Sequence, residues 1–128
     1  KNLGVKEKLH LLGFKTNPFK YVKGADLFVC SSLHEGYSTA VTESLIVGTP
    51  VVTTMCSGML ELLGDSKYGV ICKNEDDSLQ NTVLELIKDF NKYNYYKVMA
   101  ARRGKELMSL NNLKSVIKLF NNLGNDEN

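Results

Sequence analysis

Short apolar runs that alternate with segments suited to helices constrain this chain more than any other feature of its sequence. The runs are bounded by glycine, proline or polar residues, and they are Leu9–Leu12, Leu27–Cys30, Val51–Thr53 and Val70–Cys72. Runs of this length between turn residues are typical of buried strands. The intervening segments Pro18–Lys23 and Thr39–Val47 are suited to helices. The alternation predicts a Rossmann-like three-layer α/β domain, in which helices flank a short parallel sheet of about four strands.

Beyond Asn74 the pattern indicates helices only. A first helix is expected after Asp77 or Ser78 as its cap, with one apolar face made by Leu79, Val83, Leu86, Ile87 and Phe90. Further helices are expected over Tyr93–Met108 and Leu113–Leu123, and the last of these has an apolar stripe at helical spacing. The polar tail over 124–128 is expected to be disordered. We therefore expect a single domain over residues 1–123.

Composition and charge exclude several classes of protein. Sixteen basic and fourteen acidic side chains leave a formal charge of only +2, which does not indicate a nucleic-acid-binding face. No apolar run approaches the length of a membrane-spanning helix. The three cysteines contain no CxxC pair and no metal-ligand spacing with histidine, so we expect reduced, buried thiols, no metal site and a cytoplasmic location.

The segment from Ser31 to Ser44 carries the chemistry that this sequence offers. It leaves a predicted strand, turns at Gly36 and enters a predicted helix. A helix start offers free backbone N–H groups and the positive end of the helix dipole, which together favour a phosphate. Ser38 and Thr39 could cap the helix or add hydroxyl donors, and Glu43 lies about one turn further in, where a carboxylate could accept hydrogen bonds from a ribose diol. These residues alone leave open an ordinary helix start with a solvated glutamate.

The same segment resembles a known family of enzymes. Glu35 and Glu43 are separated by seven residues. On either side lie Ala25–Val29 with Ser32, Gly48–Val52, Ser57-Gly58 with Glu61, and Tyr68–Val70. In this order and spacing the residues resemble the C-terminal domain of the retaining GT-B glycosyltransferases of family four, or group 1. The resemblance covers roughly 3–105, and one departure is Met55, where such sequences often have an aspartate.

The resemblance implies a binding site for a nucleotide-sugar donor. By that resemblance Glu35 positions the transferred sugar, as a tentative catalytic residue, and Glu43 binds the donor ribose. The diphosphate would be held by the segment Gly36, Tyr37, Ser38 and Thr39, and the base would lie near Gly13 and Phe14. The donor would be a UDP-, GDP- or ADP-sugar that serves as substrate, with no separate cofactor and no metal.

The resemblance also implies a reaction and a setting. Family members retain the anomeric configuration of the sugar, so we expect a glycosyltransferase of class EC 2.4, acting in polysaccharide or cell-surface glycan biosynthesis. A glycan or lipid-linked acceptor and the cations that neutralise the diphosphate would belong to segments upstream of Lys1, including an N-terminal GT-B domain. The isolated chain would then bind donor weakly and not turn over. The expected location is the cytoplasm, at the inner face of the membrane.

Other interpretations remain open at the level of sequence. The same helix start would serve a non-catalytic α/β module that recognises a phosphate-containing ligand or a protein. A GT-B-like sugar-nucleotide epimerase would share the nucleotide site but use different acid and base residues. Arg102, Arg103 and Lys105 could also make a peripheral contact with an anionic membrane surface.

Overall fold

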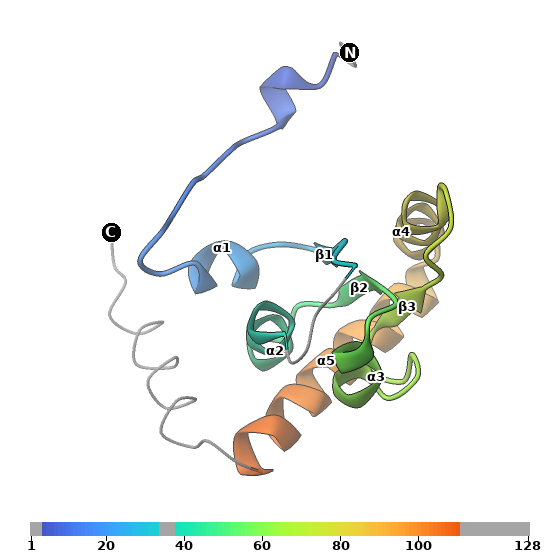
Figure 1. The fold of residues 1–128 in the computed structure, drawn as a ribbon. Helices are drawn as coiled ribbons and strands as arrows, with labels where there is room; N and C mark the ends of the chain where they lie inside the picture. The colour runs from blue at the N-terminus through green and yellow to red at the C-terminus, as the bar shows by residue number, and fades with distance from the viewer. Residues whose placement is uncertain (1–3, 34–37, 111–128) are drawn as a thin grey trace.

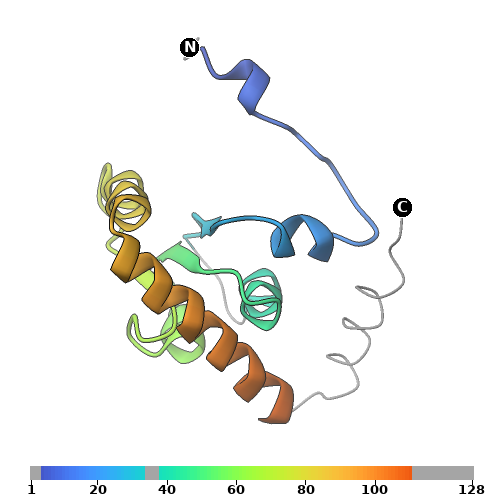
Figure 2. The ribbon, with the colours of Figure 1, turned by 180° about the vertical axis from the view of Figure 1, so that it is seen from behind.

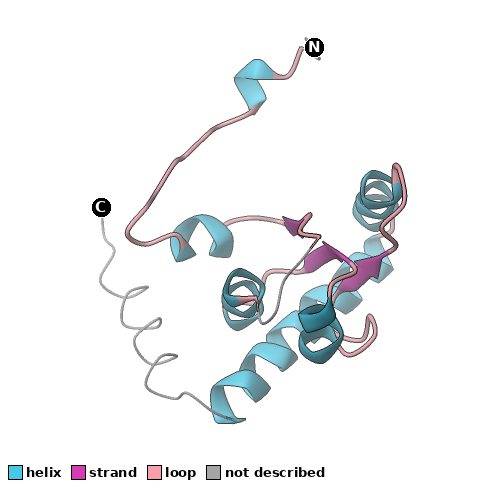
Figure 3. Ribbon diagram, viewed as in Figure 1, coloured by secondary structure: helices cyan, strands magenta, loops and turns pink. Residues whose placement is uncertain are grey.

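The computed structural model describes residues 4–33 and 38–110, and its centre is a parallel sheet (Figures 1 and 3). The three strands are β1 (Phe28–Cys30), β2 (Val51–Thr54) and β3 (Val70–Cys72), in the order β1-β2-β3. Val52 of β2 is level with Val29 of β1 and with Val70 of β3. Every residue of β2 is buried, because this strand has a neighbour on each side and helices above and below. The predicted parallel α/β sheet is confirmed.

Helices cover both faces of this sheet. They follow the chain as α1 (Phe19–Lys23), α2 (Thr39–Ile46), α3 (Ser57–Leu63), α4 (Ser78–Lys88) and α5 (Phe90–Leu110), after a short 3-10 turn η1 (Lys6–Lys8). Figure 1 shows α2 and α3 on one side of the sheet and α4 on the other, with α5 passing behind the sheet and α3. Figure 2, seen from behind, shows α5 in the foreground. The predicted three layers are therefore present, and the described chain beyond Asn74 is helical.

Two hydrophobic clusters hold these layers together. The larger lies between β2 and the helices α2, α3 and α5, and its buried side chains include Val41, Leu45, Val51, Met59 and Leu62. The smaller lies on the opposite face, where Val52, Leu86 and Tyr96 are buried together. Val51 and Val52 belong to different clusters because successive strand residues point to opposite faces of a sheet.

The end of α3 is held by a side chain from α5. Gly64 closes the helix in the left-handed conformation, with a φ of 58° that suits glycine. The Arg103 guanidinium donates from Nε to the Leu62 carbonyl at 2.8 Å and from Nη2 to the Glu61 carbonyl at 2.9 Å. These carbonyls belong to the last turn of α3, where intrahelical partners run out. Arg103 therefore joins α3 to α5 across a long sequence separation.

The predicted strand over Leu9–Leu12 is wrong in this structure. The segment is extended but pairs with no described strand, and Leu11 is 92% exposed. Figure 1 shows it running clear of the sheet between η1 and α1. An apolar run becomes a strand only where another strand can satisfy its backbone N–H and C=O groups, and β1 forms the edge of the described sheet without it.

Several helix predictions need smaller corrections. α3 was not predicted, and α5 begins at Phe90 rather than Tyr93. Asp77 occupies the N-cap position of α4, but its side chain makes no capping hydrogen bond. Phe90 is 77% exposed because α4 ends at Lys88 and Phe90 starts the next helix, and Ile87 is 55% exposed although it lies within α4. The predicted helix over 113–123 and the tail over 124–128 lie outside the described residues.

Candidate functional site

The start of α2 presents a capped helix N-terminus to solvent. Ser38 is buried and extended, and its Oγ accepts a hydrogen bond from the Val41 amide at 3.2 Å. Its carbonyl accepts the Thr42 amide at 3.1 Å, which is the first backbone bond of the helix. Thr39 and Ala40 precede these amides and are exposed, so their N–H groups need acceptors from outside the helix. A negatively charged group is favoured at such a position.

Glu43 lies on the same face of α2 as Thr39, one turn further along the helix. Its side chain is half-buried, and the described residues offer its carboxylate no hydrogen-bond or ion-pair partner. Burial raises the pKa of the Glu43 carboxyl above its ordinary value of 4.5. A half-buried carboxylate without a partner is costly to hold in a folded protein, unless a ligand or water donates to it. The helix start and this acceptor are thus placed on one side of α2.

Polar side chains tie together the segments that follow the strands. After β1, the Ser32 carbonyl accepts hydrogen bonds from Thr54 Oγ1 at 2.5 Å and from Cys56 Sγ at 2.8 Å. Thr54 is the last residue of β2, and Cys56 lies just beyond it. After β3, Asn74 Nδ2 donates to the Met55 carbonyl at 2.8 Å. These bonds join all three strand ends at the carboxyl edge of the sheet, where α/β proteins place their ligands.

The sequence prediction missed this set of cross-loop bonds. Thr54 lies just beyond the predicted strand Val51–Thr53 and was given no role, and Cys56 was expected to be a buried thiol, as it is. A threonine and a cysteine close together at a strand end are a weak signal in one sequence. Their common acceptor became visible only with the fold.

The remaining predicted site residues divide into two groups. Glu35, Gly36 and Tyr37 lie outside the described residues. Gly13 and Phe14 are described, and they lie in the extended segment before α1, where Gly13 has a φ of 65° and Phe14 is 92% exposed. The structure brings together Ser38, Thr39 and Glu43 on α2, whereas the Phe14 side chain is exposed.

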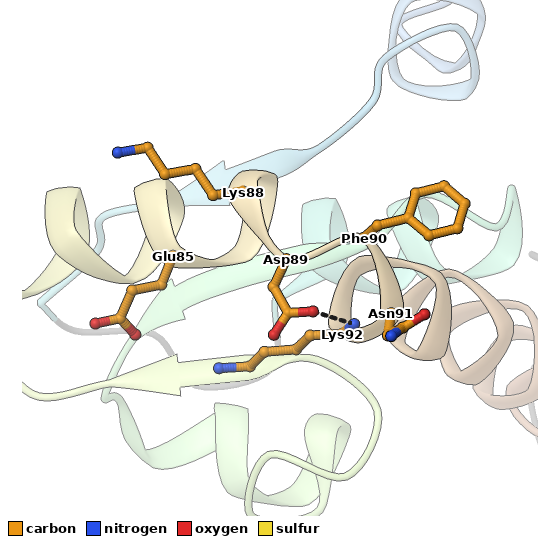
Figure 4. Close-up of a pocket in the computed structure, with 6 residues that line it drawn as sticks. All are labelled: Glu85, Lys88, Asp89, Phe90, Asn91 and Lys92. Atoms are coloured by element: carbon orange, nitrogen blue, oxygen red, sulfur yellow. Dashed lines mark hydrogen bonds between the residues drawn. The ribbon is translucent and has the colours of Figure 1, made fainter.

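A hollow on the described surface lies elsewhere, at the junction of α4 and α5 (Figure 4). It has a volume of about 620 Å³ and is lined by Glu85, Lys88, Asp89, Phe90, Asn91 and Lys92. Asp89 Oδ1 accepts the Lys92 amide at 3.0 Å, so this carboxylate caps the start of α5. The hollow has the character of an open helix junction with charges of both signs, and none of the predicted site residues lines it.

Comparison with known proteins places the chain in a class. The family model described as "Glycosyl transferases group 1" matches residues 1–103. The matched residues include the whole sheet and the start of α2 with Glu43. This chain therefore belongs to the group 1 glycosyltransferase family, as its resemblance implied.

Individual relatives in this family are longer proteins. The chain is 35% identical over 107 residues to the N-acetylgalactosamine-N,N'-diacetylbacillosaminyl-diphospho-undecaprenol 4-alpha-N-acetylgalactosaminyltransferase of Campylobacter jejuni, a match over 82% of this chain and 29% of the relative. It is 27% identical over 108 residues to the lipopolysaccharide core biosynthesis glycosyltransferase LpsE of Rhizobium meliloti, covering 84% of this chain and 31% of that protein.

A third relative is the UDP-Gal:alpha-D-GlcNAc-diphosphoundecaprenol alpha-1,3-galactosyltransferase of Escherichia coli, with 28% identity over 89 residues, 69% of this chain and 23% of the relative. The chain thus spans less than a third of the length of these relatives. Within residues 4–33 and 38–110, no helix combines the length and the hydrophobicity that crossing a bilayer requires.

Proposed function

We propose that this chain carries the donor-binding part of a retaining glycosyltransferase, with a nucleotide-diphosphate sugar as its substrate. The observation that carries the proposal is the placement of Thr39 and Glu43 on one face of α2. The first residues of this helix are exposed, and the Glu43 carboxylate has no partner among the described residues. Membership of the group 1 family supports the same interpretation. No separate cofactor is required.

In this proposal the diphosphate lies at the start of α2, held by backbone N–H groups of the segment from Gly36 to Thr39. The Ser38 side chain is buried and already accepts the Val41 amide, so we assign it the role of fixing the helix start. Glu43 accepts hydrogen bonds from the two ribose hydroxyls, which would supply donors that the described residues do not offer its carboxylate. Gly13 and Phe14 are proposed to lie near the base, where the exposed Phe14 ring is free to stack.

The chemistry follows from where charge develops. As the bond between the sugar and the diphosphate breaks, negative charge grows on the leaving phosphate, and a helix N-terminus stabilises it. A phosphate oxygen then takes the proton of the acceptor hydroxyl, while the new glycosidic bond forms on the face from which the phosphate leaves. No side-chain nucleophile is needed, and Glu35 is assigned to positioning the transferred sugar.

The acceptor is proposed to be a glycan or a lipid-linked glycan, bound by the rest of the full-length protein. Two of the relatives carry names that specify diphospho-undecaprenol substrates, and a third is named for lipopolysaccharide core biosynthesis. This supports a place in polysaccharide or cell-surface glycan biosynthesis. We further propose a location in the cytoplasm, at the inner face of the membrane. A peripheral membrane contact would involve Arg102 and Lys105, which are exposed on α5, while Arg103 is engaged with α3.

A titration of the 128-residue chain with UDP, GDP and ADP, followed through amide NMR shifts, tests the donor site. We expect weak, saturable binding with shifts concentrated at Ser38–Glu43 and a preference for one nucleotide. Glu43→Ala should weaken that binding, whereas Glu85→Ala removes an exposed carboxylate from α4 and should leave it unchanged. A folded chain that shows no shift at millimolar nucleotide would contradict a donor site within this chain.

Product analysis of the full-length protein separates the three function classes. A glycosyltransferase releases a nucleoside diphosphate as it forms a glycosidic bond, and the linkage reports retention. An epimerase would return a sugar nucleotide with inverted stereochemistry and need no acceptor, and a non-catalytic module would bind without forming product.

A further inference from the structure

Two buried side chains from the end of β2 converge on one backbone atom after β1. Thr54 is 8% exposed and Cys56 is 6% exposed. The Thr54 hydroxyl and the Cys56 thiol both donate to the Ser32 carbonyl, at 2.5 Å and 2.8 Å. A carbonyl oxygen has two lone pairs and can therefore accept from both side chains.

These bonds fix the chain where it leaves the sheet. Ser32 lies two residues beyond the end of β1, and β1 is an edge strand with only three residues. Backbone pairing along such a short edge strand would by itself hold the following residues only weakly. β2 is the central strand and is buried throughout, so it provides a rigid platform for Thr54 and Cys56.

The start of α2 is anchored to the same platform. Ser38 is buried beneath the first turn of α2, and Val41 and Leu45 of this helix share a hydrophobic cluster with Val51 of β2. Ser32 and the helix start are therefore both held in place by β2. Thr54 and Cys56 thus tie the segment after β1 to the strand that also supports α2.

We propose that Thr54 and Cys56 are positioning residues for donor binding at α2. They act through the Ser32 carbonyl, and neither touches the donor. The hydroxyl of Thr54 is the stronger donor and carries most of the effect, because a thiol donates weakly. This inference rests on the proposed function, since it concerns the geometry of the same site.

Substitutions with matched controls test the proposal in the 128-residue chain. Thr54→Val removes the donating hydroxyl and keeps the shape of the side chain, and Thr54→Ser restores the hydroxyl. The control is Thr53→Val, because Thr53 is also buried but donates to the neighbouring Thr54 carbonyl at 3.0 Å. Cys56→Ala is matched by Cys72→Ala, since Cys72 is also 6% exposed but makes no bond to Ser32.

The free energy of unfolding and the affinity for a nucleotide are measured for each variant. The nucleotide used is the one among UDP, GDP and ADP that binds the unmodified chain. Loss of a buried hydrogen bond predicts about tenfold weaker binding for Thr54→Val and about threefold for Cys56→Ala. Thr54→Ser should recover the affinity, and both controls should lose stability without losing affinity. Equal affinity losses in Thr54→Val and Thr53→Val would overturn the inference, as would unchanged affinity in Thr54→Val.

Ligand-free amide spectra keep this inference separate from the proposed function. Thr54→Val should shift the signals of Ser32, Leu33 and Thr39, whereas Thr53→Val should leave them in place. If the unmodified chain binds none of the three nucleotides, the proposed function fails by itself, and these spectra still decide whether Thr54 positions the segment. Signals at Ser32 and Thr39 that do not move in Thr54→Val would refute the positioning role.

Discussion

Gly104 of α5 lies directly against the carbonyl oxygen of Leu45 in α2. A Cβ atom at position 104 would overlap that oxygen, and it would lie only 2.8 Å from the Ile46 Cα atom. Both neighbours are backbone atoms, which cannot turn away as a flexible side chain can. The two helices therefore pack as closely as they do because residue 104 has no side chain.

This contact predicts a large effect from a small substitution. Gly104→Ala should lower the free energy of unfolding by about 3 kcal/mol, because α5 must move away from α2 and open the larger core. Urea denaturation measures the loss. Gly24→Ala is the matched control, since a Cβ there meets its nearest atom at 3.4 Å, and it should change stability by less than about 0.5 kcal/mol. Similar stability of the two variants would contradict the close packing.

Arg103 should be required for its geometry rather than for its charge. Its guanidinium donates to the Glu61 and Leu62 carbonyls and to Glu106 Oε2. Arg103→Lys keeps the charge but cannot make this set of bonds, so we expect a loss of about 1–2 kcal/mol in unfolding free energy. The neighbouring Arg102→Lys changes an exposed side chain and should have little effect. Equal results for both would show that the bonds to α3 contribute nothing to stability.

Glu43 should lower stability as pH rises, and Glu43→Gln should remove that effect. Burial raises the pKa of its carboxyl in the folded state above the ordinary 4.5, so the folded chain holds this proton more tightly than the unfolded chain. The free energy of unfolding therefore falls as pH rises above 4.5, because the folded chain must then hold Glu43 as a half-buried carboxylate. Below that pH Glu43 is protonated in both states and does not lower stability. Unfolding measured across this range should show a flatter profile in Glu43→Gln than in the unmodified chain. A parallel profile would exclude Glu43 as the cause.

Phe14 and Phe19 should respond in opposite ways to truncation. Phe19 is 4% exposed, so Phe19→Ala should cost about 3–4 kcal/mol of unfolding free energy. Phe14 is almost fully exposed, so Phe14→Ala should leave stability within about 0.5 kcal/mol. If Phe14 stacks on the base, its removal should weaken nucleotide binding without this loss of stability. Thermal unfolding and the nucleotide titration distinguish the two effects.

Prediction from sequence succeeded where burial leaves a local pattern. Val51–Thr54 is buried on both sides, so it appears in the sequence as a continuous apolar run between turn residues. The start of α2 was predictable from Ser38 and the polar residues after it, because a cap acts within a few residues. The order of these elements and their spacing also carried the resemblance to the group 1 family.

The wrong or missing predictions concern features that depend on contacts between segments distant in the sequence. Leu9–Leu12 has the pattern of a strand, but its exposure shows that an apolar run does not suffice without a paired neighbour. α3 was missed because Gly58 lies within it and its buried face depends on what α5 brings near. Phe90 matched a helical period that the break between α4 and α5 interrupts.

The sequence by itself determined the α/β class, the three strands, the start of α2 and the family. Only the tertiary structure decided that Glu43 has no partner among the described residues and that Thr54 and Cys56 share the Ser32 carbonyl. The residues of these last bonds are 22 and 24 positions apart in the chain. Local patterns report how one segment is buried, whereas a bond between distant segments exists only after the sheet has set their register.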